Sequence, residues 1–132
     1  MKTELHSDTM MIREMCEAYD VTPRALRFYE SREMLNPVRI GTRRLFTKAD
    51  RARLALILRG KRFGFTLEDI RQTLDLYDRE GEAAQRQRAR ELGVKRLAVM
   101  QAQRDELGVA IAELQGALTD ASAKGLVPRH AA

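Results

Sequence analysis

The sequence contains one cysteine, no tryptophan and only three prolines in 132 residues. The lone cysteine, Cys16, excludes a disulfide within the chain and a metal site built from several cysteines of one chain. No run of 18 apolar residues is present, and the first residues do not form the basic and apolar stretch of a signal peptide. We therefore expect a cytoplasmic protein without a membrane span, long enough for one compact domain and one extended element.

Basic residues are concentrated in one part of the chain. Between residues 24 and 62 there are twelve Lys or Arg and three Asp or Glu, a local charge of +9, whereas the rest of the chain holds twelve basic and sixteen acidic residues. A basic segment of this kind is expected of a surface that binds nucleic acid. A patch that binds anionic membranes is the alternative, but the segment contains turn signals instead of one continuous amphipathic helix.

Residues 21–30 predict a short helix with one apolar and one cationic side. Thr22 is a favourable N-cap, and Pro23 suits the first helical position. Arg24 and Arg27 are three residues apart and are therefore neighbours on the helix surface. The other side of the helix carries the apolar residues Ala25, Leu26, Phe28 and Tyr29.

A second amphipathic helix is predicted just before this one, within residues 10–19. Its apolar stripe consists of Ile12, Met15, Cys16 and Tyr19. Two short helices joined by a sharp turn at Asp20 predict a helix-turn-helix, whose second helix enters the DNA major groove, where arginine suits guanine. A surface helix with solvated arginines is the alternative. We expect Cys16 to pack as a small apolar side chain and not to act as a reactive thiol.

Residues 38–46 predict a short basic hairpin. Two alternating runs, residues 38–40 and 44–46, flank the turn residues Gly41 and Thr42. Beside a helix-turn-helix, such a hairpin is a wing whose cations meet phosphates or the minor groove. These cations are Arg39, Arg43 and Arg44. A solvated basic loop is the alternative.

Two further helices are predicted after the hairpin. Thr47, with Asp50 three residues later, indicates the start of a helix that ends at Gly64. Thr66 gives a similar signal for the next helix, whose apolar face would consist of Leu67, Ile70, Leu74 and Tyr77. A polar break over residues 78–82 follows. We therefore expect a DNA-binding domain over residues 10–78.

The spacing of apolar residues changes after the break. A heptad seam, with steps of three and four residues, predicts one long helix over residues 83–118. The seam consists of Leu97, Met100, Arg104, Leu107, Ile111, Leu114 and Leu118. A helix of this length cannot bury its seam on so small a domain, so the pattern favours dimerisation; an intramolecular packing face is the alternative. Residues 119–132 are expected to form a flexible tail, because Gly125 and Pro128 oppose a helix.

The order of these elements resembles the MerR family of bacterial transcription regulators, over about residues 10–118. Residues 11–16 are similar to the opening helix of that family, and residues 24–30 to its recognition helix. Residues 44–47, together with Asp50, are similar to its wing-to-helix junction, and residues 64–70 to the turn that leads into its fourth helix. Each segment alone is a weak signal, but their occurrence in this order is specific.

The resemblance implies a mainly α fold: a winged helix-turn-helix DNA-binding domain followed by a long antiparallel coiled-coil dimerisation helix. It implies a homodimer that binds double-stranded promoter DNA and distorts an overlong spacer for RNA polymerase, in response to an effector. By the same resemblance, Arg24 and Arg27 match major-groove contacts, Arg44 a wing contact, and Tyr29 and Lys61 phosphate contacts. The full set of expected DNA-binding residues is Thr22, Arg24, Ala25, Arg27, Tyr29, Arg43, Arg44 and Lys61.

The chain also departs from parts of the family pattern. Metal-sensing members have a cysteine at the start of the long helix and more beyond it, but no cysteine follows Cys16 here. We therefore expect no metal and no other cofactor. Drug-sensing members append a large ligand domain, and we expect none here because the tail after Leu118 is short. Residues 59–65 and 75–78 are similar to a subgroup linked to acyl-CoA and branched-chain amino-acid breakdown.

Two other functions compete with an effector-responsive regulator. One is a repressor or architectural DNA-binding protein of the same fold that has no effector, and nothing in the sequence separates it from the first. The other is an enzyme. His6 and His130 lie near the two ends, and no serine or cysteine has a histidine nearby in a catalytic arrangement. We therefore expect no catalytic residue, and a protein that acts at the bacterial nucleoid.

Overall fold

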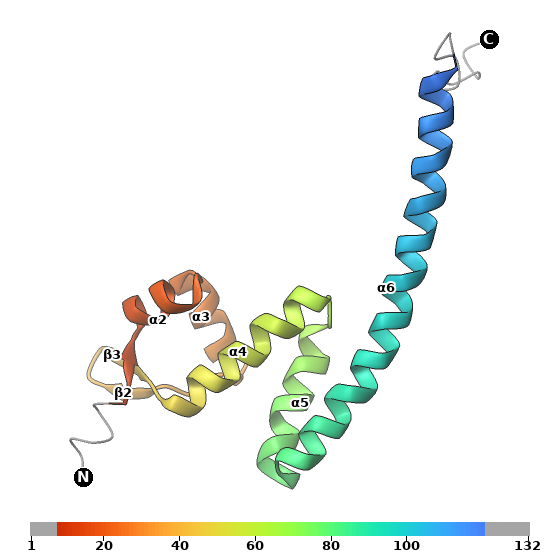
Figure 1. The fold of residues 1–132 in the computed structure, drawn as a ribbon. Coiled ribbons are helices and arrows are strands. Elements are labelled where there is room, and N and C mark those ends of the chain that lie inside the picture. Colours follow the sequence, from red (N-terminus) through yellow and green to blue (C-terminus); the bar gives the residue numbers. More distant parts are fainter. Residues whose placement is uncertain (1–7, 121–132) are drawn as a thin grey trace. The chain divides into compact units, whose positions relative to one another are not determined.

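The computed structural model describes residues 8–120 of the chain. The elements are β1 (Met10–Met11), α2 (Ile12–Tyr19), α3 (Pro23–Ser31), β2 (Val38–Ile40), β3 (Arg43–Phe46), α4 (Lys48–Phe63), α5 (Leu67–Glu80) and α6 (Glu82–Thr119). Figure 1 shows this order, with a small sheet among otherwise helical elements. The predicted mainly α fold with a winged helix-turn-helix and a long C-terminal helix is confirmed. His6, His130 and the predicted tail beyond Asp120 lie outside the described residues.

The predicted helix-turn-helix is formed by α2 and α3. Asp20 ends α2 in the left-handed conformation, with φ of 53°, and the backbone N–H of Val21 donates to the carbonyl of Cys16. Thr22 then caps α3: its Oγ1 accepts a hydrogen bond of 3.1 Å from the backbone N–H of Ala25, and Pro23 occupies the first turn. The local signals in the sequence therefore set both the turn and the start of the recognition helix.

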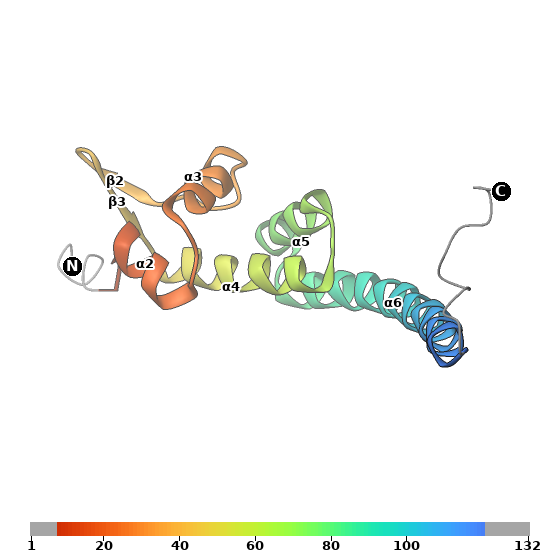
Figure 2. The same cartoon turned by 90° about the horizontal axis from the view of Figure 1, so that it is seen from above.

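The wing is larger than the sequence predicts. β2 and β3 form the expected hairpin around Gly41, whose φ of +61° suits glycine. Residues 10 and 11, predicted to begin the first helix, instead form the strand β1, which pairs with β3 in the order β1-β3-β2. A third strand stabilises the wing at its base, because a two-stranded ribbon alone is marginal in water. Seen from above, α3 and the tip of the hairpin lie on the same side of α4 (Figure 2).

One apolar core joins the helix-turn-helix, the sheet and the next two helices. Its buried residues come from α2, α3, the loop after α3, β3, α4 and α5. They are Met15, Leu26, Tyr29, Met34, Leu35, Phe46, Leu54, Ile57, Ile70 and Leu74. Cys16 is partly buried and packs against this core, as expected of a small apolar side chain. Phe28, predicted on the apolar face, is 45% exposed, because it projects on the same side of α3 as Arg24.

The two helices α4 and α5 form the predicted pair. Thr47 and Asp50 form a reciprocal capping box at the start of α4, and Gly64 ends it with φ of 85°. Gly60 brings the helices close together: a Cβ atom at this position would lie 2.8 Å from the Ile70 side chain. The outer end of the predicted α5 face is more open than expected, because Tyr77 is half-exposed beside a hollow that Leu56 and Leu74 also line.

The break before the long helix is shorter than predicted. Helix α5 continues to Glu80 and α6 begins at Glu82, so only Gly81, with φ of 91°, separates them. The long helix has 38 residues, in agreement with the helix predicted over residues 83–118, and none of them is buried. The chain divides into two compact units within this helix, between Ala89 and Arg90. None of the helices between residues 8 and 120 has the length and apolar character needed to cross a membrane.

Candidate nucleic-acid interface

The recognition helix α3 is held by its inner face and presents its cations outward. Leu26 and Tyr29 are buried in the core, whereas Arg24 and Arg27 are exposed. Within residues 8–120, neither arginine forms an ion pair with an acidic side chain. A guanidinium that is not committed to a protein carboxylate retains all its N–H donors for a ligand.

A concavity of about 440 Å³ lies between α3, the end of α4 and the start of α5. It brings together five of the residues predicted to bind DNA, although one of them is more than thirty positions away in the sequence. These five are Thr22, Arg24, Ala25, Tyr29 and Lys61. The concavity is also lined by Phe28, Phe65 and Leu67. An apolar hollow with cations at its edge can receive a sugar-phosphate backbone, whose phosphates attract the cations while the sugars contact the apolar atoms.

Lys61 connects the end of α4 to the recognition helix. Its Nζ atom lies 5.8 Å from the centre of the Tyr29 ring, a cation–π contact. Lys61 is in the last turn of α4, where a positive side chain also interacts favourably with the helix dipole. Tyr29 is only 2% exposed, so any contact with a ligand has to use the small part of its surface that faces the concavity.

The other three predicted residues lie outside this concavity. Arg27 projects from α3, and Arg43 and Arg44 belong to strand β3 of the wing. Arg43 is exposed and has no acidic partner among the described side chains. Arg44 is different: its Nε donates to Oε2 of Glu30 at 2.7 Å, and its side chain is 25% exposed. The nitrogens at the end of its guanidinium are the donors left for DNA.

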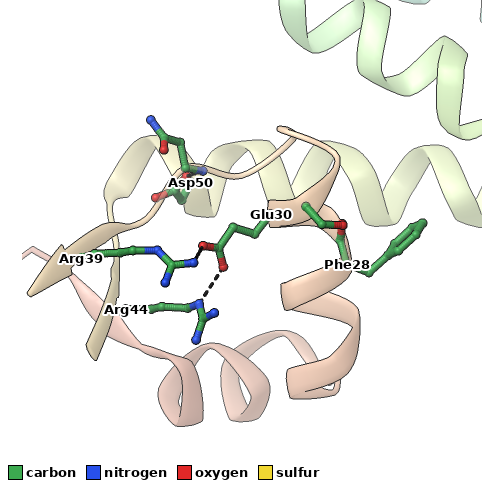
Figure 3. A network of polar contacts seen from close by, with 7 residues as sticks. Phe28, Glu30, Arg39, Arg44 and Asp50 are labelled. Atoms are coloured by element: carbon green, nitrogen blue, oxygen red, sulfur yellow. Dashed lines mark hydrogen bonds and ion pairs between the residues drawn. The ribbon is translucent and has the colours of Figure 1, made fainter. Parts of the chain in front are cut away.

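Glu30, at the end of α3, binds two strands of the wing, β2 and β3. Its Oε1 accepts from Arg39 in β2, and its Oε2 accepts from Arg44 in β3. Figure 3 shows the two guanidinium groups converging on this carboxylate. The sequence analysis did not assign this role to Glu30, because the contacts join residues nine and fourteen positions apart and leave no periodic pattern.

A buried carboxylate fixes the loop that leads into the wing. Asp50, only 3% exposed, accepts from the backbone N–H of Asn36 at 2.9 Å and from the backbone N–H of Thr47 at 3.0 Å. In Figure 3 it lies above the contacts of Glu30 with Arg39 and Arg44, at the start of α4. The Nε of Arg53 also donates to the Met34 carbonyl in this loop at 2.8 Å. The loop therefore sets the position of β2 relative to α3.

Phe28 is the exposed residue of this surface that the sequence analysis placed wrongly. It lines the concavity, and the Arg32 guanidinium lies 5.6 Å from the centre of its ring. Helical spacing in the sequence indicates this exposed position, because Phe28 is four residues after Arg24 and so shares its face of the helix.

The described residues offer no group for a metal ion. Within residues 8–120, no three His, Cys, Asp or Glu side chains are close enough together to hold one.

Residues 10–77 match the family described as MerR HTH family regulatory protein. Residues 51–117 match the family described as MerR, DNA binding. The chain belongs to the MerR family. It is therefore a DNA-binding transcription regulator by family, and the winged helix-turn-helix described above is the MerR DNA-binding domain.

The similarity to MerR-family relatives extends over most of the chain. It is 34% identical over 107 residues to the HTH-type transcriptional regulator ZntR of Escherichia coli (strain K12). The aligned region covers 79% of this chain and 70% of that protein. Among solved structures it is similar to a MerR-family transcriptional regulator from Bacillus cereus, with a TM-score of 0.64 and 28% identity. That match covers 83% of this chain and 79% of the other.

Two further MerR-family structures contain a ligand. HiNmlR, a regulator lacking the sensor domain and bound to promoter DNA, has a TM-score of 0.65 and 26% identity; 89% of this chain and 90% of that chain are covered. PbrR691 from Ralstonia metallidurans CH34, in complex with lead(II), has a TM-score of 0.64 and 31% identity. That match covers 82% of this chain and 84% of the other.

Proposed function

We propose that this MerR-family protein binds promoter DNA as a homodimer and regulates transcription by changing the shape of the DNA between its two half-sites. The observation that carries the proposal is the concavity between α3, the end of α4 and the start of α5, in which Thr22, Arg24, Ala25, Tyr29 and Lys61 meet. The similarity to HiNmlR, which was solved on promoter DNA, supports it. The protein would act in the bacterial cytoplasm at the nucleoid, and the proposal gives it no catalytic role.

On DNA, α3 would enter the major groove. The exposed Arg24 and Arg27 would then donate to base edges, where bidentate contacts to guanine are the commonest specific contacts of arginine. Lys61 and Tyr29 would contact phosphate at the edge of the groove, and Arg43 and Arg44 would carry the wing contact with the backbone or minor groove. The phosphate contacts position the protein, and the two arginines of α3 supply the sequence preference.

The long helix α6 supports the homodimer. Its 38 residues span about 57 Å at 1.5 Å per residue, and its apolar seam residues are exposed in the single chain. They are Leu97, Met100, Leu107, Ile111, Leu114 and Leu118. Arg104, the polar member of the predicted seam, forms an ion pair with the adjacent Asp105, at 3.4 Å. A row of large apolar side chains at heptad spacing favours pairing with another helix.

The charges on α6 indicate how the two helices are oriented. Residues 86–104 contain six Lys or Arg and one Glu, and residues 105–120 contain four Asp or Glu and no Lys or Arg. This layout is unfavourable in an isolated helix, whose dipole prefers acidic residues at the N-terminus and basic residues at the C-terminus. In an antiparallel pair, each acidic half lies beside the basic half of its partner. A parallel pair would place like charges together.

An antiparallel pair of long helices would hold two recognition helices and two wings at a fixed separation. DNA that has to fit both can be bent or untwisted between the half-sites, at a cost of about 1–6 kcal/mol for bending, offset by the added contacts. We propose that this distortion realigns an overlong promoter spacer for RNA polymerase, under the control of a small-molecule effector. A metal effector is not proposed, because the residues between 8 and 120 group no ligands for one.

Transcription with purified RNA polymerase tests the mechanism. On a promoter with an overlong spacer, the regulator should activate; shortening the spacer by roughly one or two base pairs should make the promoter active alone and turn the bound regulator into a repressor. Equal activation at both spacer lengths would contradict the distortion mechanism and favour direct recruitment of polymerase. Activity that no cellular small molecule changes would favour the effector-independent repressor or architectural protein.

A further inference from the structure

We propose that Glu30 is a positioning residue that sets DNA specificity: it holds the wing arginines in a fixed orientation relative to the recognition helix. The inference rests on the proposed function and adds to it a residue that does not itself contact DNA. Glu30 lies in the last turn of α3, the same helix that carries Arg24 and Arg27. Its side chain is 14% exposed, and its two carboxylate oxygens bind one arginine each.

The register of the wing explains why a carboxylate is needed at this point. Arg39 and Arg44 are direct partners across the β2–β3 pair. Like charges that face each other across two strands destabilise the pairing. The Glu30 carboxylate lies between the two guanidinium groups, so each cation has an anion beside it (Figure 3).

The two contacts have different strengths. Arg44 is 25% exposed and donates its Nε at 2.7 Å, whereas the Arg39 side chain is 59% exposed. Ion pairs that are largely removed from water are screened less than exposed pairs. The contact between Glu30 and Arg44 is therefore the firmer one. It orients a guanidinium whose terminal nitrogens remain available for DNA.

Glu30 also limits the contribution of Arg39 and Arg44 to the affinity for random DNA. A carboxylate next to two arginines reduces the local positive charge by one and engages donors that would otherwise bind any phosphate. Non-specific affinity for DNA depends on the number of phosphates neutralised. Removal of the charge at Glu30 should therefore have two opposite effects: weaker discrimination between DNA sequences, and stronger binding to random DNA.

The test compares three proteins on two DNAs: wild type, Glu30→Gln and Glu33→Gln, each with a duplex selected by the wild type and with random duplex. Glu30→Gln should reduce the ratio of selected to random affinity by roughly tenfold, the size of one charge-assisted hydrogen bond. It should also raise the affinity for random DNA and steepen its salt dependence, by about 0.9 for each additional phosphate contacted. Glu33 is an exposed acid at the same end of α3 with no ion pair to a described residue, so Glu33→Gln controls for the loss of one negative charge.

A second variant keeps the test valid if Glu30→Gln does not fold. Arg44→Lys retains the positive charge but removes the Nε donor that binds Glu30, so it should lose discrimination as Glu30→Gln does. The double variant should lose less discrimination than the sum of the two single losses, because both changes remove the contact between Glu30 and Arg44. A variant that binds both DNAs more weakly in equal proportion, or that discriminates as the wild type does, would overturn the role of Glu30. A wild type that prefers no sequence would overturn the proposed function, and this inference with it.

Discussion

The Nζ atom of Lys61, in the last turn of α4, lies 5.8 Å from the centre of the Tyr29 ring in the recognition helix α3. The contact joins two elements whose residues line the same concavity. A cation held over an aromatic ring loses part of its freedom before any ligand arrives, so binding a phosphate there costs less conformational entropy. We propose that this position serves the phosphate contact that the family resemblance implies for Lys61.

Lys61→Ala should weaken binding to all DNA sequences alike. A phosphate contact carries no sequence information, and its loss should reduce the slope of log affinity against log salt concentration by about 0.9. Titrations at several salt concentrations, with selected and random duplexes, measure both quantities. Arg59→Ala is the matched control, because Arg59 is exposed on α4 but lies two residues earlier, on another side of the helix. A fall in affinity for the selected duplex alone would assign a base contact to Lys61.

Arg24→Ala and Arg27→Ala should each relax the sequence preference. A good bidentate contact to a base contributes about 1–3 kcal/mol of discrimination, and the loss should be confined to the base pairs that the arginine reads. Affinities for duplexes with single substitutions in a half-site show which positions become tolerant. If the affinities of either variant for selected and for random DNA fall in the same proportion, that arginine does not read bases.

Leu107→Asp should dissociate the dimer, because it places a charge in the apolar seam of α6. Val109→Asp is a close control: both side chains are 61% exposed in the single chain, but only Leu107 is a member of the heptad seam. Sedimentation at micromolar concentration should show monomers of Leu107→Asp and dimers of the wild type and of Val109→Asp. A folded wild-type monomer at that concentration would contradict the seam as the dimer interface.

Gly60→Ala should destabilise the contact between α4 and α5. The added Cβ would lie 2.8 Å from the Ile70 side chain, and overpacking of this kind typically costs about 1–3 kcal/mol. Gly116→Ala is the control, because nothing lies within 4 Å of its Cβ position and alanine raises helix stability there by about 0.8–1 kcal/mol. Denaturant unfolding at one protein concentration measures the free energy of unfolding of the wild type and of both variants. Equal stability of Gly60→Ala and the wild type would show that Ile70 moves aside without cost.

The sequence predicted the elements whose signals lie within a few residues. The Thr22 side chain, and those of Thr47 and Asp50, accept hydrogen bonds from backbone N–H groups three residues away, so the pattern and the structure agree. β1 could not be predicted in this way. Its two residues pair with Leu45 and Phe46, and a strand so short has no periodicity of its own.

The same distinction applies to the candidate site. The positions of Arg24 and Arg27 on the outer side of α3 follow from helical spacing, and the structure agrees. The meeting of Lys61 with Tyr29, and of Glu30 with the wing, depends on tertiary packing; Lys61 was expected at the site only through the resemblance to the family. Asp50 was predicted as a capping residue, but its hydrogen bond to the backbone of Asn36, fourteen positions away, was not.

Selection of binding sites from a random pool of duplex DNA by the purified wild-type protein tests the central claim most directly. Two recognition helices related by the symmetry of an antiparallel dimer should enrich an inverted repeat, with both half-sites at one fixed separation. The base pairs between the half-sites should change their reactivity to chemical probes when the protein binds. Enrichment of one half-site alone, of repeats with variable separation, or of no sequence at all would contradict a dimer that reads promoter DNA with α3 and its wing.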